Sequence, residues 1–268
     1  MLEFQGRDYL IATSVKHHGD WDKIYQDMHV PSSMTYEEAA ELIKSVKSRV
    51  VTALDDDYPS EILKACPKPP FVLYYYGDLS LAQDHKRIVT VVGSRKPTSY
   101  AVEKTRSICA EVINKGYIVA SGLARGIDTI AAEATIDMPG RTIAVLGCGI
   151  DVVYPPENTL LRDRIASTGL LLSEYPNSEP PYPYRFPARN RILASISKGT
   201  FIGEAGPHSG TLITAAFAME VNHDVAALPF RCDEGFVNNS LIKNGAALVE
   251  TAEYLVDFLT STTHYYGK

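Results

Sequence analysis

A glycine-punctuated turn offers the clearest potential for chemistry in this chain. The stretch Ser121-Gly-Leu-Ala-Arg-Gly-Ile-Asp128 follows a run of apolar residues and precedes residues with helical spacing. Gly122 and Gly126 permit positive φ and let a ligand approach the backbone closely, and Arg125 between them can grip a phosphate with two N–H groups. A helix beginning near Gly126 would point its free N–H groups at the same anion. The stretch therefore predicts a phosphate-binding turn.

Three further segments have residue types suited to an anionic ligand. Gly93-Ser-Arg-Lys-Pro-Thr98 combines small residues, hydroxyls and two cations after an apolar run. Phe186-Pro-Ala-Arg-Asn-Arg191 places an aromatic ring beside two arginines at an expected helix start, with no compensating carboxylate nearby. Bases stack on rings and cations hold the backbone when single-stranded nucleic acid binds. The fourth segment, Glu204 to Thr211, is a glycine-containing loop in which Ser209 and Thr211 are candidate helix caps.

Each of these loops also has a plain structural interpretation. The Gly-Ser-Arg triplet at 93–95 occurs in ordinary turns between a strand and a helix, and Phe186 could be a core residue whose neighbouring arginines pair with distant acids. Asp128 and Glu204 could form a catalytic pair, although bracing of their own loops is the simpler role. His208 is most simply a loop histidine. From the residues alone, these interpretations stay open.

Several conventional active sites and cofactor sites are missing from the sequence. It has no GxxxxGK[ST] phosphate loop, no GxGxxG dinucleotide fingerprint and no GxSxG nucleophile elbow. The seven histidines show no zinc-ligand spacing with the four cysteines, which include no CxxC pair. We therefore expect no cofactor and no metal. Scattered cysteines fit a reduced, cytoplasmic setting, and no apolar run approaches the roughly 18 to 20 residues of a membrane span.

Charge is distributed unevenly along the chain, which has a formal net charge of −6. Residues 1–65 hold twelve acidic and seven basic side chains, so −5 of that total lies there. The segment from Arg185 to Lys198 holds four basic side chains and no acid. The overall charge argues against a polyanionic partner, but the local basic segment is compatible with one.

The elements that must position these loops show two patterns. Residues 1–50 look helical, with Thr35 as a plausible N-cap for a helix over 36–47. Residues 51–85 form a turn-rich connecting segment that contains an edge strand. From residue 86 to residue 268, short apolar runs alternate with helical spacing. This alternation predicts parallel βαβ units in a doubly wound sheet.

The expected strands and helices bracket the four loops. We expect strands at 71–76, 88–92, 117–120, 142–146, 170–172, 200–202 and 225–228. We expect helices at 100–115, 126–138, 158–168, 188–197, 211–221 and 251–259. In an open α/β sheet, ligands bind at the carboxyl ends of the strands, near the point where the strand order reverses. The loops should therefore face one shared crevice.

Taken together, these loops resemble the DNA-processing protein A family (DprA, also called Smf). The resemblance covers about Tyr58 to Val249. The motifs that carry it are Tyr58-Pro59, Gly93-Ser94-Arg95, Ser121 to Asp128, Ala144 to Gly147 with Gly149, Asp151, Tyr154-Pro155 and Asn158, Ser173 to Pro176, Phe186 to Ile192, Glu204-Ala205, Ser209 to Ala215, and Leu241-Ile242. Each motif alone is common, but so many in this order form a specific signal.

The resemblance implies an α/β fold with an extended Rossmann-like, doubly wound and mostly parallel sheet after a small helical (SAM-like) domain. It implies a homodimer without catalytic activity that binds single-stranded DNA and loads the RecA recombinase onto DNA taken up in natural transformation. The loops and the resemblance together predict these DNA-binding residues: Gly93, Ser94, Arg95, Gly122, Arg125, Phe186, Arg189, Asn190, Arg191, Ser209, Gly210 and Thr211. Many members also carry a C-terminal winged-helix domain, which we do not expect here.

Three positions depart from the family pattern. Ala132 stands where the family usually has a histidine, and Phe230 follows Pro229 where a glycine is usual. Val237 replaces a glycine shortly before the Asn-x-Leu-Ile motif. These departures bear on the far side of the pocket and not on the fold.

Two other functions fit parts of the sequence. Gly203-Glu204 with Ser209-Gly-Thr211 is similar to part of the nucleotide site in nucleoside-monophosphate phosphoribohydrolases, a class of Rossmann-like hydrolases. The Pro-Gly-Gly-x-Gly-Thr run that is usual in that class is missing. The chain could also be chiefly an interaction hub, with an apolar C-terminal region as its dimer face. Phe186 and the arginines of the loops favour single-stranded DNA over both.

Overall fold

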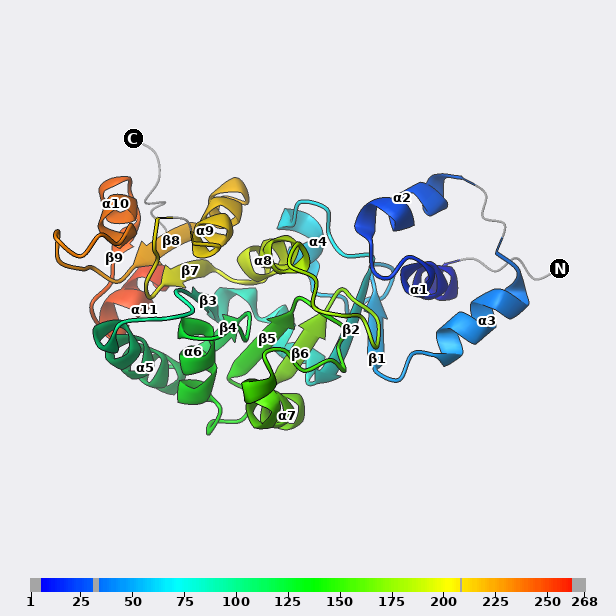
Figure 1. Ribbon diagram of the computed structural model, residues 1–268, viewed down its shortest axis with the longest axis horizontal. Helices are drawn as coiled ribbons and strands as arrows, with labels where there is room; N and C mark the ends of the chain where they lie inside the picture. Colours follow the sequence, from blue (N-terminus) through cyan, green and yellow to red (C-terminus); the bar gives the residue numbers. More distant parts are fainter. Residues whose placement is uncertain (1–5, 31–33, 208, 262–268) are drawn as a thin grey trace.

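One mixed sheet runs through most of the chain in the computed structural model, which describes residues 6–30, 34–207 and 209–261 (Figure 1). Within these residues the sheet has nine strands in the order β1-β2-β6-β5-β4-β3-β7-β8-β9. The strands are β1 (Arg49–Thr52), β2 (Val72–Gly77), β3 (Ile88–Val92), β4 (Ile118–Ser121), β5 (Thr142–Leu146), β6 (Leu170–Ser173), β7 (Gly199–Ile202), β8 (Asp224–Ala227) and β9 (Ala247–Leu248). Neighbours from β6 to β9 pair in parallel, and β2 is antiparallel to both β1 and β6. The predicted α/β class with a mostly parallel sheet is confirmed.

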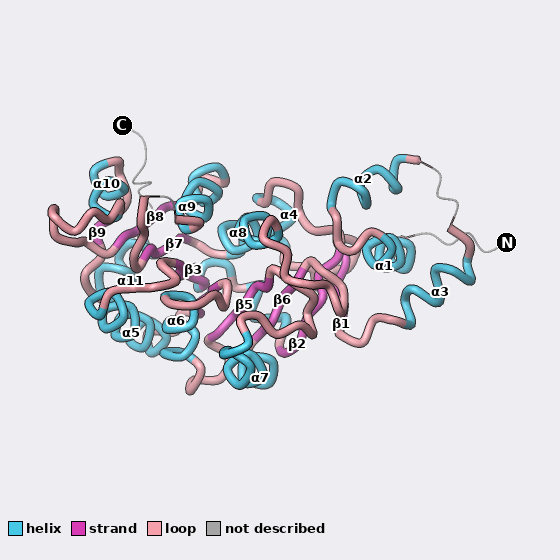
Figure 2. Tube along the Cα trace, viewed as in Figure 1, coloured by secondary structure: helices cyan, strands magenta, loops and turns pink. Residues whose placement is uncertain are grey.

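Helices cover both faces of the sheet (Figure 2). The α-helices of the described residues are α1 (Arg7–Lys16), α2 (Trp21–His29), α3 (Tyr36–Lys44), α4 (Ser60–Ala65), α5 (Ser99–Asn114), α6 (Ile127–Thr135), α7 (Thr159–Thr168), α8 (Arg185–Ile196), α9 (Thr211–Glu220), α10 (Asn238–Lys243) and α11 (Ala252–Thr260). Helices α4, α8, α9 and α10 lie on one side of the sheet, and α5, α6, α7 and α11 lie on the other (Figure 1). Among the helices described, none has the length and apolar character to cross a membrane.

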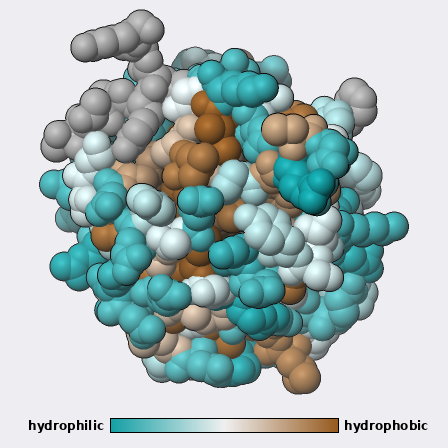
Figure 3. All heavy atoms as spheres, turned by 90° about the vertical axis from the view of Figure 1, so that its left-hand side faces the viewer, coloured by the Kyte–Doolittle hydropathy of each residue, from teal (hydrophilic) through white to brown (hydrophobic). Residues whose placement is uncertain are grey.

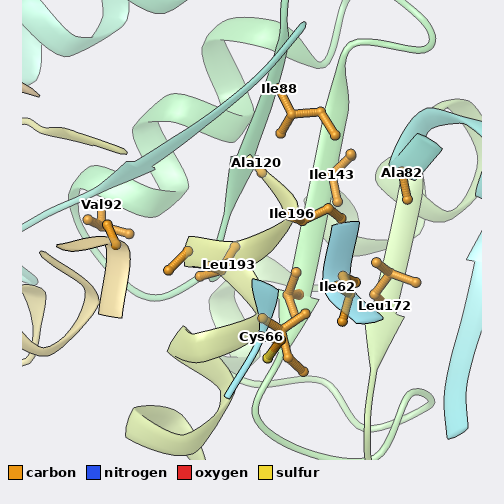
Figure 4. Packing of buried hydrophobic residues seen from close by; sticks show 14 of the residues in the cluster. Ile62, Cys66, Ala82, Ile88, Val92, Ala120, Ile143, Leu172, Leu193 and Ile196 are labelled. Carbon is orange, nitrogen blue, oxygen red and sulfur yellow. The ribbon is translucent and has the colours of Figure 1, made fainter. Parts of the chain in front are cut away.

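Strand β3 contributes side chains to the hydrophobic cores on both faces of the sheet. Ile88 and Val92 pack into the core under α4, α8 and α9 (Figure 4), whereas Val89 and Val91 pack against α5, α6 and α11. Successive side chains of a strand point to opposite faces, so a strand covered on both faces is apolar throughout. The hydroxyl of Thr90 donates to a backbone carbonyl of α8 at 2.7 Å. The predicted strand at 88–92 is confirmed, and it lies in the middle of the sheet.

The three N-terminal helices pack beside the antiparallel end of the sheet (Figure 1). Helix α1 contacts α3, β1 and β2, and the Tyr74 hydroxyl of β2 donates to Ser14 Oγ of α1 at 3.0 Å. A capping box begins α3: Thr35 Oγ1 accepts the Glu38 N–H at 3.2 Å, and the Glu38 carboxylate accepts the Thr35 N–H at 2.8 Å. The predicted N-cap is confirmed, and the helix ends earlier than expected, at Lys44.

Two expectations about elements need correction. The predicted edge strand at 71–76 corresponds to β2, which lies between β1 and β6, so the edge is β1. The four residues of β1, Arg-Val-Val-Thr, neither alternate nor form a continuous apolar run, so the sequence did not mark them as a strand. The helix expected from Ala188 begins at Arg185, so Pro187 lies in the first turn, where its missing N–H costs no intrahelical bond. The division of the chain at residues 50 and 85 stays a prediction.

The strand order reverses at β3. From β3 the chain proceeds to β4, β5 and β6 on one side, then returns to β7 on the other side of β3 and continues to β8 and β9. Loops that leave the carboxyl ends of β3 and β7 therefore diverge, which opens a crevice between them. The four loops predicted to bind an anion follow β3, β4, β6 and β7. The four loops therefore lie at the same end of the parallel strands.

Candidate functional site

A cleft of about 650 Å³ opens at the carboxyl ends of β3 and β7. Nine of the predicted site residues line it: Gly93, Ser94, Arg95, Phe186, Arg189, Asn190, Ser209, Gly210 and Thr211. A smaller pocket beside it shares Arg95, Tyr154 and Phe186 with the cleft and adds Gly122 and Arg125. Guanidinium, hydroxyl, amide and aromatic groups thus face one space, a composition suited to phosphates and flat rings.

Arg189 is buried beside the cleft and braces the strand ends. Its Nη1 donates to the Gly122 carbonyl at 2.9 Å and to the Val145 carbonyl, and its Nε donates to Asn190 Oδ1 at 3.1 Å. Burial lowers the pKa of the guanidinium, and the nearby Asp128 carboxylate opposes that shift. Arg189 therefore joins α8 to the ends of β4 and β5 and orients the amide of Asn190.

Asp128 organises the glycine turn from inside the protein. Its carboxylate accepts the Gly122 N–H at 3.0 Å, and the side chain is buried. Burial raises the pKa of Asp128 to about 6, while the positive charge of Arg189 opposes the rise. The observed hydrogen bond fits the bracing role that we expected for Asp128.

Two glycines of the turn are required by close contacts. A Cβ on Gly122 would overlap the guanidinium of Arg189, and a Cβ on Gly126 would overlap the Ser94 carbonyl oxygen. Gly126 also has a φ of +78°, which side chains rarely adopt. The turn therefore lies directly against Arg189 and against the loop that follows β3.

The backbone N–H groups of the turn are less available than expected. Ile127, the first residue of α6, donates its N–H to the Ser94 carbonyl at 3.1 Å, and Thr129 donates to the Ala124 carbonyl at 3.1 Å. The N–H of Gly122 is bound to Asp128. Donors that we expected to face an anion are thus satisfied within the protein, because the loop after β3 packs onto the start of α6. An anion here would rely mainly on side chains.

Arg95 and Phe186 lie next to each other in the lining of the cleft. The guanidinium carbon of Arg95 lies 5.9 Å from the centroid of the Phe186 ring, and Tyr154 tilts against the same ring with centroids 5.2 Å apart. Arg95 is exposed and forms no salt bridge with any residue in the described ranges. An exposed cation and two aromatic rings therefore lie together in the cleft, a combination that suits a nucleotide's phosphate and base.

Arg125 is held by a neighbouring acid. Its Nε and Nη2 donate to the two carboxylate oxygens of Glu157, the second at 3.2 Å. These hydrogen bonds raise the pKa of Arg125 and lower the pKa of Glu157. The two side chains are 56% and 50% exposed. A phosphate in the smaller pocket would compete with Glu157 for this arginine.

Glu204 connects the loops that follow β7 and β3. Its Oε2 accepts the N–H and the hydroxyl of Thr98 at 2.9 and 2.7 Å, and the side chain is buried. This contact fits the organising role expected for Glu204. The N-cap of α9 is Gly210, and Ser209 Oγ accepts the Thr211 N–H at 3.1 Å. Thr211 is thus the first helical residue, and the expectation that it caps the helix was wrong.

Arg191 does not line the cleft, which corrects another expectation. Its Nη2 donates to Glu174 Oε1 at 2.5 Å, its Nε donates to the Lys68 carbonyl at 3.0 Å, and both ionic side chains are buried. Residues two apart on a helix do not share a face, so Arg189 and Arg191 point in different directions. The local sequence lacks a carboxylate to compensate Arg191, and the fold supplies one from Glu174, the residue after β6.

The departures from the family pattern lie outside the cleft lining. Ala132 is buried in the core on α6, and Phe230 packs edge-on against Tyr100 with centroids 5.3 Å apart. Val237 donates its N–H to a backbone carbonyl of the loop after β7 at 3.0 Å. His208, expected to be a loop histidine, lies outside the described residues.

Sequence reasoning missed part of the lining. Tyr154 entered only as part of a motif, and Pro181 and Pro183, which also line the cleft, received no role. The signal that could have found this part is Pro181-Tyr-Pro-Tyr184, which alternates prolines with aromatics just before the arginine-rich helix.

The sheet order and a cationic, aromatic cleft at the switch point define a Rossmann-like binding domain. Residues 49–260 match the model of the family described as DNA recombination-mediator protein A. The chain belongs to this family, and the resemblance stated from the sequence is confirmed.

Curated relatives carry the corresponding names. Protein Smf of Synechocystis sp. is 44% identical over 212 residues, which cover 77% of this chain and 52% of the relative. DNA processing protein DprA of Streptococcus pneumoniae is 42% identical over 205 residues, which cover 75% of this chain and 70% of that protein. The chain therefore spans about half the length of the Synechocystis relative.

Two solved structures share the fold. DNA processing protein A from Streptococcus pneumoniae superposes with a TM-score of 0.78 at 33% identity, covering 93% of this chain and 92% of that one. The protein from Helicobacter pylori gives a TM-score of 0.70 at 31% identity, covering 80% of this chain and 96% of that one. The Helicobacter structure is described as giving insight into a single-stranded DNA binding mode of that protein.

Proposed function

We propose that this protein binds single-stranded DNA in the cleft and acts, without catalysis of its own, as a recombination mediator. One observation carries the proposal: Arg95 extends over the ring of Phe186 in an open cleft and has no salt-bridge partner among the described residues. The name of the family and the binding mode described for the Helicobacter relative support it.

In this proposal each side chain of the cleft has its own part. Bases would stack on Phe186 and Tyr154, since every base offers a π face, and Arg95 would bind a neighbouring phosphate. Arg125 would bind a second phosphate after release from Glu157. Arg189 acts from within, by holding the glycine turn and the amide of Asn190 in position.

A salt-titrated binding assay tests the proposal. Affinity for an oligothymidylate should fall steeply with salt, and Arg95→Ala should reduce the slope of log K against log salt by about 0.7, the value for one phosphate contact on a single strand. Arg106→Ala on α5 is the control, because Arg106 is also an exposed arginine but lies outside the cleft lining. Absence of salt dependence, or tighter binding to duplex, would contradict the proposal.

The partners form the second part of the proposal: the RecA recombinase, which the protein would load onto incoming strands in natural transformation, and a second copy of the chain. Strand β9 ends the sheet within the described residues and bears the exposed Leu248, and Tyr254 of α11 is also exposed. Figure 3 shows this end of the molecule, where apolar surface lies among hydrophilic side chains. An apolar sheet edge suits self-association.

Two measurements check these partners. Sedimentation of the protein with and without an oligonucleotide would separate a constitutive dimer from DNA-driven assembly. The rate of RecA filament formation on a single strand should rise when the protein is added.

A cytoplasmic setting, where RecA acts, fits the four free cysteines, of which Cys66, Cys109 and Cys148 are buried.

The nucleotide hydrolase alternative depends on Glu204. A catalytic glutamate must reach its ligand, but Glu204 is buried, does not line the cleft, and holds Thr98 with Oε2. We therefore favour the non-catalytic function. Incubation with AMP provides the test: release of free adenine that disappears in Glu204→Gln would reverse this preference.

A further inference from the structure

Two exposed tyrosines stack on each other beside the cleft. Tyr182 and Tyr184 belong to the loop between β6 and α8, and their ring planes differ by 9° with centroids 5.7 Å apart. The residues are 45% and 66% exposed. An aromatic side chain stabilises a fold mainly through the area that it buries, so packing of the core does not account for these two rings. Part of each ring surface is therefore accessible to a ligand that is itself flat.

The loop holds the rings in place without a ligand. A proline precedes each tyrosine and fixes the backbone there. The guanidinium carbon of Arg185 lies 4.9 Å from the Tyr182 centroid and 5.9 Å from the Tyr184 centroid. Arg185 is itself fixed by a salt bridge to Glu179 at 2.9 Å, and both side chains are largely buried. Groups that are ordered beforehand lose less entropy when a ligand binds.

The tyrosines continue the surface of the cleft. The prolines that precede them, Pro181 and Pro183, line the cleft together with Arg95 and Phe186. Phe186 follows the tyrosine loop directly, at the start of α8. A DNA strand that binds Arg95 through a phosphate and Phe186 through a base can therefore pass over Tyr182 and Tyr184 as it leaves the cleft.

We propose that Tyr182 and Tyr184 form a base-stacking subsite for nucleotides of a single strand that extend beyond the cleft. This inference rests on the proposed function. Ring faces accept any base, so the subsite adds affinity without sequence preference, on the order of tenfold for one stacked base. Stacking releases no counterion, so its contribution is independent of salt, unlike that of Arg95.

The experiment varies the length of the DNA strand and the side chains at positions 182 and 184. Oligothymidylates of roughly 4 to 16 nucleotides, the range of site sizes known for single-strand binding domains, are titrated against wild type, the double variant Tyr182→Ala/Tyr184→Ala, and Tyr182→Phe/Tyr184→Phe. Tyr25→Ala is the matched control, because Tyr25 is exposed and stacked on Trp21 of α2. Melting temperatures show whether each variant is folded.

The expected pattern is specific to stacking. The alanine pair should weaken binding of the longer strands about tenfold at every salt concentration, leave the shortest bound strand unaffected, and keep the wild-type salt slope. The phenylalanine pair and Tyr25→Ala should behave as wild type.

Three results would overturn the subsite. The first is an equal loss for all strand lengths, and the second is an equal loss in the phenylalanine pair. The third is unchanged DNA affinity with reduced RecA filament formation, which would assign the rings to a protein partner. Failure of wild type to bind any strand would instead refute the proposed function, so the two failures are distinguishable.

Discussion

The guanidinium of Arg189 fills the space that a side chain at position 122 would need. Its Nη1 also donates to the Gly122 carbonyl at 2.9 Å, so a residue of α8 fixes the turn after β4. Asp128 accepts the N–H of the same glycine at 3.0 Å. The turn that carries the exposed Arg125 is therefore supported by two buried ionic groups. Changes to the support and changes to the binding surface should have different effects.

The contact between Arg189 and Gly122 predicts that Gly122→Ala destabilises the protein. The new methyl group would force Arg189 to move and weaken its bonds to two carbonyls, and overpacking of this kind costs about 1–3 kcal/mol. Urea unfolding measures the change. Gly210→Ala is the control, since a Cβ there meets nothing within 4 Å and φ is −58°. Equal stability of the two variants would mean that Arg189 has room to shift.

Arg191→Ala should destabilise the fold and leave the electrostatics of DNA binding unchanged. Loss of Arg191 would leave Glu174 buried without its partner, at a cost of about 3–5 kcal/mol in the free energy of unfolding. Arg95→Ala should show the opposite pattern, with unchanged unfolding and a smaller salt slope for single-stranded DNA. Both variants need both measurements. If Arg191→Ala lowered the slope and Arg95→Ala did not, the assignments of the two arginines would have to be exchanged.

The fold was predictable where one segment contains its own signal. The strand at Ile88–Val92 is apolar because helices cover both of its faces, and each predicted loop is rich in glycine, hydroxyls or cations after such a strand. The carboxyl ends of parallel strands lie at the same end of a sheet, so the loops had to meet there. The composition of the cleft therefore followed from the residues of these loops. Strand β1, Arg-Val-Val-Thr, has neither an apolar run nor alternation, and the six residues of α10 are too few to show helical periodicity.

The roles of the arginines were not predictable, because they depend on contacts between distant segments. Arg191 meets Glu174, 17 residues earlier, only after β6 and α8 have packed. Arg189 lies 67 residues from Gly122, whose carbonyl it binds. The N–H of Ile127 is bound by the loop after β3, so the anion cradle expected from the glycines depends on side chains instead. A local sequence can show that a cation is present but not which partner it meets.

The pair Arg125–Glu157 predicts that removal of the acid strengthens DNA binding. Glu157→Gln would free Arg125 from competition and remove a negative charge near the smaller pocket, so affinity for a single strand should rise several-fold at low salt and less at high salt. The melting temperature should hardly change, because the pair is exposed. Glu133→Gln, at the partner of Arg106, is the control. A lower affinity in Glu157→Gln would mean that Glu157 positions Arg125 for the phosphate.

The buried carboxyl of Asp128 predicts a stability that depends on pH. Burial raises its pKa from an ordinary value of 3.8 to about 6, so between these values the folded state binds the proton more tightly than the unfolded state. The contribution of Asp128 is therefore fully present below about pH 4 and is lost as the pH rises through about 6. Asp128→Asn cannot titrate, so the free energy of unfolding of wild type minus that of the variant, measured in urea, should fall between pH 4 and pH 7 and then level off. Other groups cancel in this difference. A difference that rises with pH would show that the charge of Arg189 outweighs burial and keeps the carboxylate ionised.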